Sequence, residues 1–399
     1  MVYEDGRATV MKFLHISDLH IGKIVNDFSM LEDQRFILDQ ITGMAVANEV
    51  DAVVIAGDIY DRAIPPGEAV TLFDDFLTGL VMKKVRVIMI SGNHDSPERI
   101  SFLEKLLDSR GVYIAGVMKD VLTRVRMETK AGETRETEFV LLPFVKSAKT
   151  GASSSSEAVE KLLDGYWTEE RAQQEAGQQK NRVLVTHFFI TDGGREPELS
   201  DSETTIHVGG LDNVEASLLS GFEYVALGHI HKSQQIGDHP VWYAGSPLKY
   251  SFGETGQTKC ALLVTMGDEG LCSVQRLSLN PLREFRKIRG SLKELLDRGQ
   301  CEGEERRDYI QAILTDRGEL INPIGTLRSV YPNIMQIVRE ERELSGDCGE
   351  VPLSGEKSPV RHKDPLTLFE EFYSQVREEE LSADGRRIVE ELVKELEIC

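Results

Sequence analysis

The chain has 399 residues, 40% of them hydrophobic and 28% charged, which is typical of a globular protein with two or three domains. No apolar run approaches the roughly 18 residues that a membrane span needs, and the N-terminus lacks the basic and apolar regions of a secretory signal, so we expect a cytoplasmic protein. The formal net charge of −21 argues against a large basic surface, and so against binding of nucleic acid without a partner.

Short apolar runs alternate with helical patterns in the first part of the chain, after a tail that we expect at residues 1–11. Apolar residues spaced by three and four predict the helices, and short β-branched runs predict the strands. In chain order these are strands at 12–17, 51–56 and 86–91 and helices at 32–48, 67–82 and 98–108. This alternation predicts an α/β fold (α+β in some schemes) in which helices cover a sheet.

The middle of the chain combines further strands with two long polar stretches. Residues 121–142 are predicted to form a pair of strands, and 146–180 a polar surface segment outside the core, with helix-forming stretches on both sides of a serine run. Residues 191–213 are rich in Gly, Ser, Asp and Thr and predict a long loop. The remaining strand candidates lie at 182–187, 223–231, 240–247, 260–266 and 272–277.

A break at Asn280-Pro281 precedes a small α+β unit that we expect to extend to residue 340. Its predicted elements are strands near 283–288, 308–314 and 334–338 and helices near 291–297 and 322–330. Residues 341–364 are linker-like, and two amphipathic helices are predicted within 365–399. Because these helices follow a linker and have little else to pack on, we expect them to dock in a groove of a partner protein.

Five polar motifs each follow directly on one of the apolar runs: DLH, GDIYD, GNHD, TH and GHIH. Open α/β sheets build their sites at the carboxyl ends of strands, so the motifs are expected to converge. A D-x-H or GD pair alone would be a weak signal, whereas GNHD together with GHIH is a strong one. The motifs supply seven candidate metal ligands, which are Asp18, His20, Asp58, Asn93, His187, His229 and His231.

Carboxylate, imidazole and amide oxygen ligands suit manganese, iron or zinc, and the five scattered cysteines contain no CxxC pair that would indicate a thiolate site. Two ions about 3.5–4 Å apart need a shared carboxylate. Asp58 is the natural bridge, because it is central in chain order and follows a glycine that permits a tight turn. We expect one ion to bind Asp18, His20, Asp58 and His231, and the other to bind Asp58, Asn93, His187 and His229.

The catalytic candidates are His94 and Asp18. His94 follows the ligand Asn93 directly and has no expected ligand role, so we expect it to face the scissile phosphate. There it would stabilise the transition state or protonate the leaving oxygen. Asp18 or Asp61 could orient its ring.

Other polar residues near the motifs leave alternatives open. Asp61, Lys23 and Arg62 could lie near the substrate, although a solvated face is an equal alternative for the two basic residues. His207, in the long loop, is either an ordinary loop residue or close to the substrate. His15 lies inside a strand run and is predicted to be a packed core residue.

The order of the motifs resembles that of the calcineurin-like metallophosphoesterase family. Longer strings resemble more narrowly the SbcD family of bacterial nuclease subunits: FLHISDLHIGK at 13–23, VVIAGDIYDRAIPP at 53–66, SGNHDS at 91–96, YVALGHIHKSQ at 224–234 and YAGSPLKYSFGE at 243–254. This resemblance implies a two-sheet metallophosphoesterase sandwich flanked by helices at 12–280. It also implies a small DNA-binding capping domain at 281–340, and helices at 365–399 that dock on an ATPase.

The resemblance further implies a DNA nuclease that acts in repair, recombination and replication. Its activities would be those of an exonuclease and of an endonuclease at hairpins and blocked ends, by two-metal hydrolysis with Mn²⁺, or Fe²⁺ or Zn²⁺ as alternatives. The implied partner is an SbcC-type coiled-coil ATPase, and the chain itself has no GxxxxGK[ST] phosphate loop. The protein would be nucleoid-associated. Archaeal and eukaryotic relatives carry a histidine where this chain has Asp61, which concerns substrate handling.

The resemblance also implies a homodimer formed through helices 67–82 and 98–108, although packing on the sheet would explain most of their apolar residues. Two other functions remain open. A phosphodiesterase or phosphatase for small molecules or proteins would use the same metals, but it has no need of the region from 281 to 397. A non-enzymatic scaffold would have no need of the complete ligand set.

Overall fold

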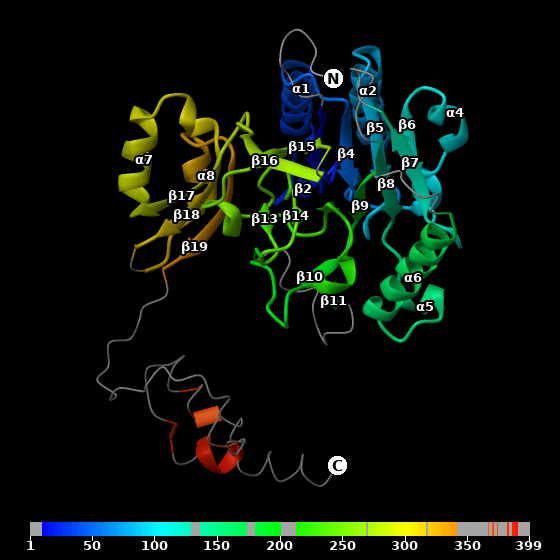
Figure 1. The fold of residues 1–399 in the computed structure, drawn as a ribbon. Helices are drawn as coiled ribbons and strands as arrows, with labels where there is room; N and C mark the ends of the chain where they lie inside the picture. The colour runs from blue at the N-terminus through cyan, green and yellow to red at the C-terminus, as the bar shows by residue number, and fades with distance from the viewer. Residues whose placement is uncertain are drawn as a thin grey trace. The chain divides into compact units, whose positions relative to one another are not determined.

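The computed structural model of the chain describes residues 10–128, 136–173, 180–200, 213–268, 270–316 and 318–340, and a few residues between 366 and 389. The chain divides into two compact units, Met1–Glu341 and Arg342–Cys399. All the sheets and helices below belong to the first unit (Figure 1). Most of the two predicted C-terminal helices lie outside the described residues. Among the residues that are described, no helix is both long and apolar enough to cross a membrane.

The first of two six-stranded sheets has four parallel strands, β1, β4, β5 and β6, with β15 antiparallel to β1 and β16 antiparallel to β15. Its strands in spatial order are β16 (Gly270–Ser278), β15 (Cys260–Gly267), β1 (Met11–Ile16), β4 (Ala52–Ala56), β5 (Arg86–Ile90) and β6 (Val112–Ala115). The strand β1 begins at Met11, one residue inside the predicted tail. Burial on both faces explains the near-continuous apolar runs of β4 and β5.

The second sheet has β14, β12, β9 and β8 in parallel, with an antiparallel strand at each edge. Its strands in spatial order are β13 (Gln234–Gln235), β14 (Val241–Tyr243), β12 (Tyr224–Leu227), β9 (Asn181–Thr186), β8 (Thr137–Leu142) and β7 (Thr123–Met127). The predicted strand pair within 121–142 is therefore confirmed.

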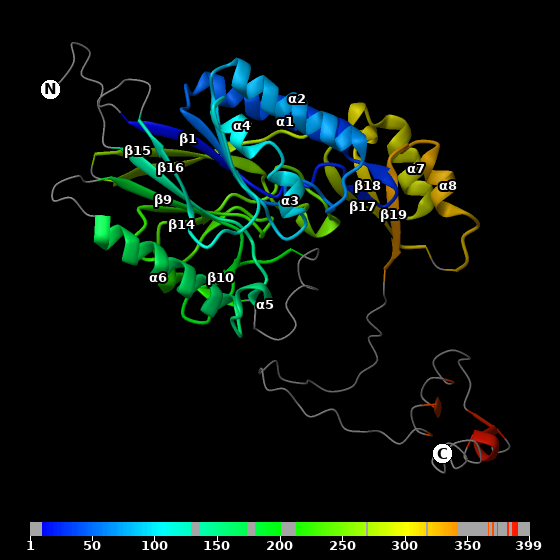
Figure 2. The same cartoon turned by 90° about the vertical axis from the view of Figure 1, so that its right-hand side faces the viewer.

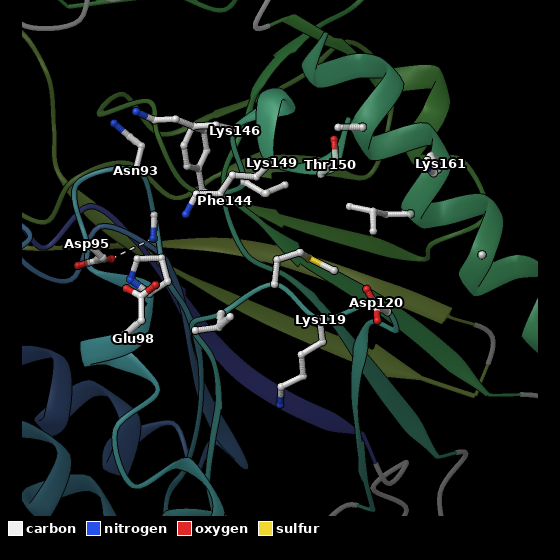
Figure 3. A pocket seen from close by; sticks show the side chains of 18 residues that line it. Asn93, Asp95, Glu98, Lys119, Asp120, Phe144, Lys146, Lys149, Thr150 and Lys161 are labelled. Atoms are coloured by element: carbon white, nitrogen blue, oxygen red, sulfur yellow. Dashed lines mark hydrogen bonds between the residues drawn. The ribbon is translucent and has the colours of Figure 1, made fainter. Parts of the chain in front are cut away.

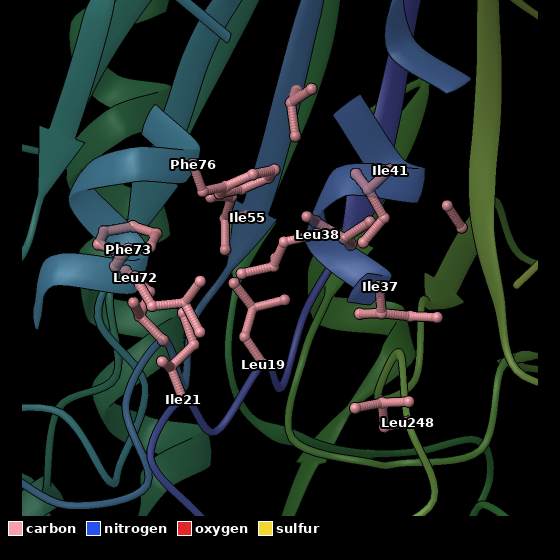
Figure 4. Close-up of a cluster of buried hydrophobic side chains, with 14 of the residues drawn as sticks. Leu19, Ile21, Ile37, Leu38, Ile41, Ile55, Leu72, Phe73, Phe76 and Leu248 are labelled. Atoms are coloured by element: carbon pink, nitrogen blue, oxygen red, sulfur yellow. The ribbon is translucent and has the colours of Figure 1, made fainter. Parts of the chain in front are cut away.

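The two sheets pack face to face, and helices cover both outer faces (Figure 2). Successive side chains of β1 point to opposite faces of the first sheet. Phe13 contacts Phe139 of the second sheet, with 5.3 Å between the ring centroids, whereas Leu14 lies in the core beneath the helices. The helices α1 (Leu31–Ala47) and α2 (Gly67–Met82) cover the first sheet, where Phe76 packs beside Ile55 (Figure 4). The predicted α/β sandwich flanked by helices is confirmed.

The outer face of the second sheet is covered by α6 (Ser155–Gln173), which follows the short α5 (Ser147–Thr150). Val159, Leu163 and Tyr166 of α6 are buried in the core cluster beneath it. The prediction that 146–180 lies outside the core is therefore wrong, because these three residues share one helical face among charged neighbours. Two short strands, β10 (Phe189–Thr191) and β11 (Asn213–Glu215), and the 3₁₀ turn Ala216–Leu219 complete this side.

The predicted helix at 98–108 is broken in two, as α3 (Pro97–Ile100) and α4 (Glu104–Asp108). Leu103 between them has a left-handed backbone with φ of 63°, which ends a regular helix. Phe102 and Leu106 are 70% and 64% exposed, so packing on the sheet does not account for these apolar residues. Packing explains other apolar residues of this region, because Ile100 is buried and Leu107 packs against the core.

A third, parallel sheet consists of β17 (Phe285–Gly290), β18 (Tyr309–Leu314) and β19 (Ile334–Arg339). Its helices are α7 (Leu292–Cys301), which begins with a capping box of Ser291 and Glu294, and α8 (Pro323–Arg328). These elements share a core of their own. Arg283 ties this region to α1 through a 2.6 Å contact with Asp33. The remaining short elements of the described part are β2 (Ile24–Val25), β3 (Phe28–Ser29) and the 3₁₀ turns Phe252–Glu254 and Glu304–Arg307.

Candidate metal centre

All five polar motifs lie at the carboxyl ends of inner strands. DLH follows β1, GDIYD follows β4 and GNHD follows β5 in the first sheet. His187 follows β9 and GHIH follows β12 in the second sheet. Because these strands are parallel neighbours and the sheets pack face to face, the motifs meet at one end of the sandwich.

The backbone at this end is held in conformations that side-chain-bearing residues rarely adopt. Asp18, His20, Asp58 and His229 have φ of 52°, 43°, 50° and 103°. Such positions cost roughly 1–3 kcal/mol each and persist where the surroundings enforce them, typically at functional sites. Here the amide N–H of His20 donates to the carbonyl of Asp58 at 3.0 Å, which locks the two loops together.

Two glycines of the motifs are required by close approach. A Cβ on Gly92 would lie 2.1 Å from Oδ1 of Asp58, and one on Gly57, whose φ is 87°, would lie 2.4 Å from Nδ1 of His187. Any side chain at either place would displace a candidate ligand. The glycine of GD thus makes room for the facing histidine as well as forming a turn.

One group of candidate ligands gathers Asp18, His20 and His231, whose donor atoms all lie within 4.8 Å of one another. Nε2 of His20 lies 3.2 Å from Nε2 of His231. Asp58 is the next neighbour, with Oδ2 at 3.7 Å from Nε2 of His20. These four residues are the set predicted for the first ion.

A second group gathers around Asn93. Its Oδ1 lies 3.0 Å from Nε2 of His187 and 3.1 Å from Nδ1 of His229. Oδ2 of Asp58 lies 3.4 Å from the same nitrogen of His187. Asp58 therefore stands between the two groups, as expected of a shared carboxylate, and all seven predicted ligands lie together.

Asp58 and His187 form a buried pair at the centre, and their charges favour the ionised form of Asp58. Burial opposes its ionisation, but His187, His20 and His94 outweigh this and hold the pKa of Asp58 well below its usual range. Burial likewise disfavours a charged His187, yet Asp58 dominates and raises its pKa to about 9. Burial lowers the pKa of His20 to about 4, so this ring is neutral near pH 7 and offers a lone pair.

The donor set fits divalent metal ions. Nδ1 of His187 lies 2.7 Å from the carbonyl of Ala56 and donates to it, which leaves Nε2 directed at Asn93 and Asp58. The raised pKa means that this nitrogen holds a proton when no metal is bound, and a metal ion would replace that proton. Nε2 of His20 and Nε2 of His231 face each other at hydrogen-bond distance, and only one of the two can supply a proton when both rings are neutral. Several lone pairs and a carboxylate converging in a buried space are what a cation requires.

His94 lies beside this centre, and a nitrogen of its ring is within 4.8 Å of donor atoms of His20 and Asp58. Its amide donates to Oδ1 of Asp58 at 2.9 Å. Nδ1 of its ring donates to the backbone carbonyl of Asp61 at 3.0 Å, so Nε2 is the ring nitrogen left to face a substrate. Of the two residues considered for orienting this ring, Asp61 is the one in contact, through its backbone carbonyl and not its carboxylate.

The other predicted residues divide by position. The carboxylate of Asp61 accepts from Lys23 at 2.6 Å and lies 3.5 Å from Nδ1 of His20, so both residues adjoin the centre. Arg62 is 72% exposed at its side chain and lies 3.7 Å from Asp61. His207 lies outside the described residues. His15 is buried and contacts the hydroxyl of Tyr224 at 2.9 Å and the carbonyl of Leu227, which confirms its packed position.

Several residues that support the centre were not predicted. Asp95 accepts from the amides of Ile59, Tyr60 and Gly92, which joins the loop after β4 to the loop after β5. Asp95 is the last residue of the GNHD motif, so the motif itself could have pointed to it.

Two further supports come from segments without a motif. The side-chain amide of Gln34 donates to the carbonyl of His20 at 2.7 Å. Nζ of Lys259 donates to Glu254 at 2.6 Å and to the carbonyl of His231 at 2.9 Å. No sequence pattern marks these residues, because they are far from the motifs along the chain.

Residues 11–233 match the family model of the calcineurin-like phosphoesterases, and the chain belongs to this family. It is therefore a metal-dependent phosphoesterase, as predicted from its motifs, and divalent metal binding follows from the same membership. Residues 281–377 match a second model, the SbcD C-terminal one, which is described as the type 5 capsule protein repressor C-terminal domain.

Among curated proteins, the chain is 29% identical to the SbcD subunit of the SbcCD nuclease of Staphylococcus epidermidis over 384 residues. The match covers 93% of this chain and 95% of that relative, so the predicted resemblance to SbcD is confirmed. Solved structures with similarity include TT1561 of Thermus thermophilus, at 12% identity and a TM-score of 0.39 over 68% of this chain and 100% of that one. A dimetal phosphatase from Danio rerio has 14% identity and a TM-score of 0.39 over 68% and 99%.

Proposed function

We propose that this chain is the nuclease subunit of an SbcCD-type complex and hydrolyses DNA phosphodiesters with two divalent ions, Mn²⁺ foremost. The observation that carries the proposal is the convergence of seven side chains on a central Asp58, in a chain whose near-full-length relative is named as an SbcCD nuclease subunit. Two such ions, when bound, activate water and offset the negative charge of a phosphate.

The residues would divide the work as follows. Asp18, His20, Asp58 and His231 hold one ion, and Asp58, Asn93, His187 and His229 hold the other. His94, fixed through Nδ1, presents Nε2 to the leaving oxygen and donates a proton or a hydrogen bond to it. Asn93, His94 and His229 are the partly exposed members of the site, so the substrate enters on their side.

The partners belong to the same proposal. The exposed apolar residues Phe102, Leu103 and Leu106, together with Val70 of α2, support a homodimer through this region. The helices expected at 365–399 would dock on a coiled-coil ATPase, and the unit at 281–340 would cap the DNA, in the cytoplasm near the nucleoid. The net charge of −21 favours a partner that supplies much of the DNA-binding surface.

The test compares linear and hairpin DNA with a small chromogenic diester, bis(p-nitrophenyl) phosphate, in the presence of Mn²⁺. The wild-type protein should cleave both kinds of substrate. Asp58→Asn should reduce both activities by a factor of at least about 100, because it removes the charge shared by the two groups of ligands. His94→Ala should reduce kcat while leaving the Mn²⁺ content unchanged.

Two results would contradict the proposal. Cleavage of the diester without cleavage of either DNA would favour the small-molecule phosphodiesterase. Full DNA cleavage by Asp58→Asn would remove the assigned mechanism.

A further inference from the structure

A cavity of about 720 Å³ lies beside the candidate metal centre, between the start of α3 and the pair α5–α6 (Figure 3). Asn93 lines the cavity and also belongs to the second ligand group, so the cavity adjoins the metal centre. Its volume is within the range of about 300–1,000 Å³ in which proteins hold ligands of nucleotide size. A polymeric substrate bound at the metal centre would therefore have room for one more of its units in this cavity.

The charge of this cavity differs from that of the whole chain. Lys146, Lys149 and Lys161 line it, and no described carboxylate lies within 4.0 Å of their amino groups. Lys119, a fourth lining lysine, pairs with Glu104 at 3.1 Å. In a chain of net charge −21, three lysines that lack a close carboxylate on one cavity wall indicate an anionic ligand.

The acidic residues of the wall offset this charge only in part at the end next to the metal centre. Asp95 is buried, and three backbone amides already donate to its carboxylate. Glu98 lies at the same end as Asn93 and interacts with Lys149, whereas Asp120 lies beside Lys119, away from Asn93 (Figure 3). Lys146 and Lys149 together therefore outnumber the one exposed carboxylate at the end of the cavity near Asn93.

An aromatic ring stands at the same end. Phe144 is half-buried, and its ring contacts those of His187, at 6.4 Å and nearly perpendicular, and Phe188, at 5.5 Å. These contacts fix the ring, while its uncovered part faces the cavity beside Asn93 and Lys146 (Figure 3). A fixed ring next to amino groups is the combination with which proteins bind single-stranded nucleic acid, by stacking and phosphate contact.

We propose that this cavity is a subsite for the nucleotide adjacent to the scissile phosphate, with Lys146 and Lys149 binding its phosphate and Phe144 stacking on its base. The proposal rests on the proposed function, because it requires a polynucleotide in the metal centre. It extends that function, because the preferred substrate would then be a strand with at least one nucleotide beyond those joined by the scissile phosphate. A small diester lacks the second phosphate group that Lys146 and Lys149 would bind.

The experiment uses the full-length protein and a fluorescein-labelled 20-nucleotide single strand. The dissociation constant is measured by fluorescence anisotropy in EDTA, where the strand is not cleaved, at several salt concentrations. The variants are Lys146→Glu/Lys149→Glu and, as a matched charge change outside the cavity, Lys83→Glu/Lys84→Glu at the exposed end of α2. Hydrolysis of bis(p-nitrophenyl) phosphate with Mn²⁺ reports whether each variant is folded and competent.

The cavity variant should raise the dissociation constant about tenfold or more, whereas Lys83→Glu/Lys84→Glu should leave it within about twofold of the wild-type value. The slope of log affinity against log salt should decrease by about 0.7 for each phosphate contact that is lost. Phe144→Leu should weaken binding by about fivefold or more without changing that slope, because stacking releases no counterions.

An equal effect of the two double variants would overturn the subsite, and so would a wild-type protein that does not bind the strand. A wild-type protein that binds the strand, shows the expected variant pattern and hydrolyses only the small diester would refute the proposed nuclease function and leave the subsite standing.

Discussion

At the residue scale, the site combines strained backbone with buried charge. Asp18, His20, Asp58 and His229 all have positive φ, so the loops after β1, β4 and β12 turn sharply as they leave their strands. Gly92 and Gly57 allow the loops to approach within distances that a Cβ would forbid. The motifs are therefore recognisable in a sequence because the geometry allows few substitutions there, even though the strain itself is invisible before the structure is known.

The buried pair of Glu254 and Lys259 is a positioning device for His231. Oε1 of Glu254 lies 3.7 Å from Nδ1 of His231, and Lys259 donates both to Oε2 of Glu254 and to the carbonyl of His231. Burial opposes ionisation of Glu254, but His231 and Lys259 outweigh it and lower its pKa to about 2. The ring of His231 is thus held by a fixed negative charge behind it, as metal-binding histidines commonly are.

We expect Glu254→Gln to weaken Mn²⁺ binding by about 10–100-fold, because the amide no longer holds the ring of His231 by its charge. Isothermal titration of the metal-free protein with Mn²⁺ measures this, and the melting temperature of the same sample reports its stability separately. Glu284→Gln is the control, since Glu284 pairs with Lys249 at 2.7 Å and does not contact His231. An unchanged Mn²⁺ affinity in a less stable Glu254→Gln protein would show that Glu254 is only structural.

At the element scale, the strands were predictable because β1, β4, β5 and β9 are buried on both faces and have short apolar runs. The break in the helix predicted at 98–108 was not predictable, because nothing in its pattern shows that Leu103 adopts a left-handed conformation. The site shows the same division. Its seven converging residues follow strands and could be named from motifs, whereas Gln34 and Lys259 reach the site only through the tertiary fold.

The helix α6 is attached to the second sheet by a buried carboxylate as well as by apolar contacts. Glu138 of β8 accepts from Tyr166 of α6 at 3.0 Å, from Lys180 at 3.1 Å and from Arg126 at 3.0 Å. Burial opposes its ionisation, but the hydrogen bonds from Lys180 and Arg126 outweigh it, so the pKa of Glu138 lies below its usual value. The segment is polar in composition and yet part of the core, because Tyr166 and Lys180 direct their polar groups to this buried carboxylate.

This lowered pKa predicts how stability depends on pH. The folded protein binds the proton of Glu138 less tightly than the unfolded chain does, so its contribution is complete above the unfolded pKa of about 4.3 and is lost as the pH falls toward the folded value. We expect Glu138→Gln to lower the melting temperature at pH 7, and the difference from wild type to narrow below about pH 4. Glu160→Gln, at an exposed position of α6, should show no such narrowing. A difference that stays constant with pH would contradict the assignment.

At the scale of the whole molecule, the charge is distributed unevenly between the two units. The second unit, residues 342–399, contains 15 acidic and 8 basic side chains, which is −7 of the total −21 and leaves −14 for residues 1–341. The site and the lysine-lined cavity both belong to the first unit. Local charge in the cavity must therefore bind phosphate against a repulsive field from the remainder of the chain, which makes binding sensitive to salt and to the partner's charge.

Deletion of residues 342–399 should separate catalysis from assembly, because the second compact unit contributes none of the described site residues. We expect the truncated protein to melt within about 2 °C of the full chain and to hydrolyse bis(p-nitrophenyl) phosphate at an unchanged rate. It should no longer bind an SbcC-type ATPase, measured by size-exclusion chromatography of the mixture. Asp58→Asn in the full chain is the converse control, because it should lose hydrolysis and keep the partner. A truncated protein that still binds the ATPase would locate the docking surface in the first unit, and one that loses hydrolysis of the diester would show that the second unit supports the metal centre.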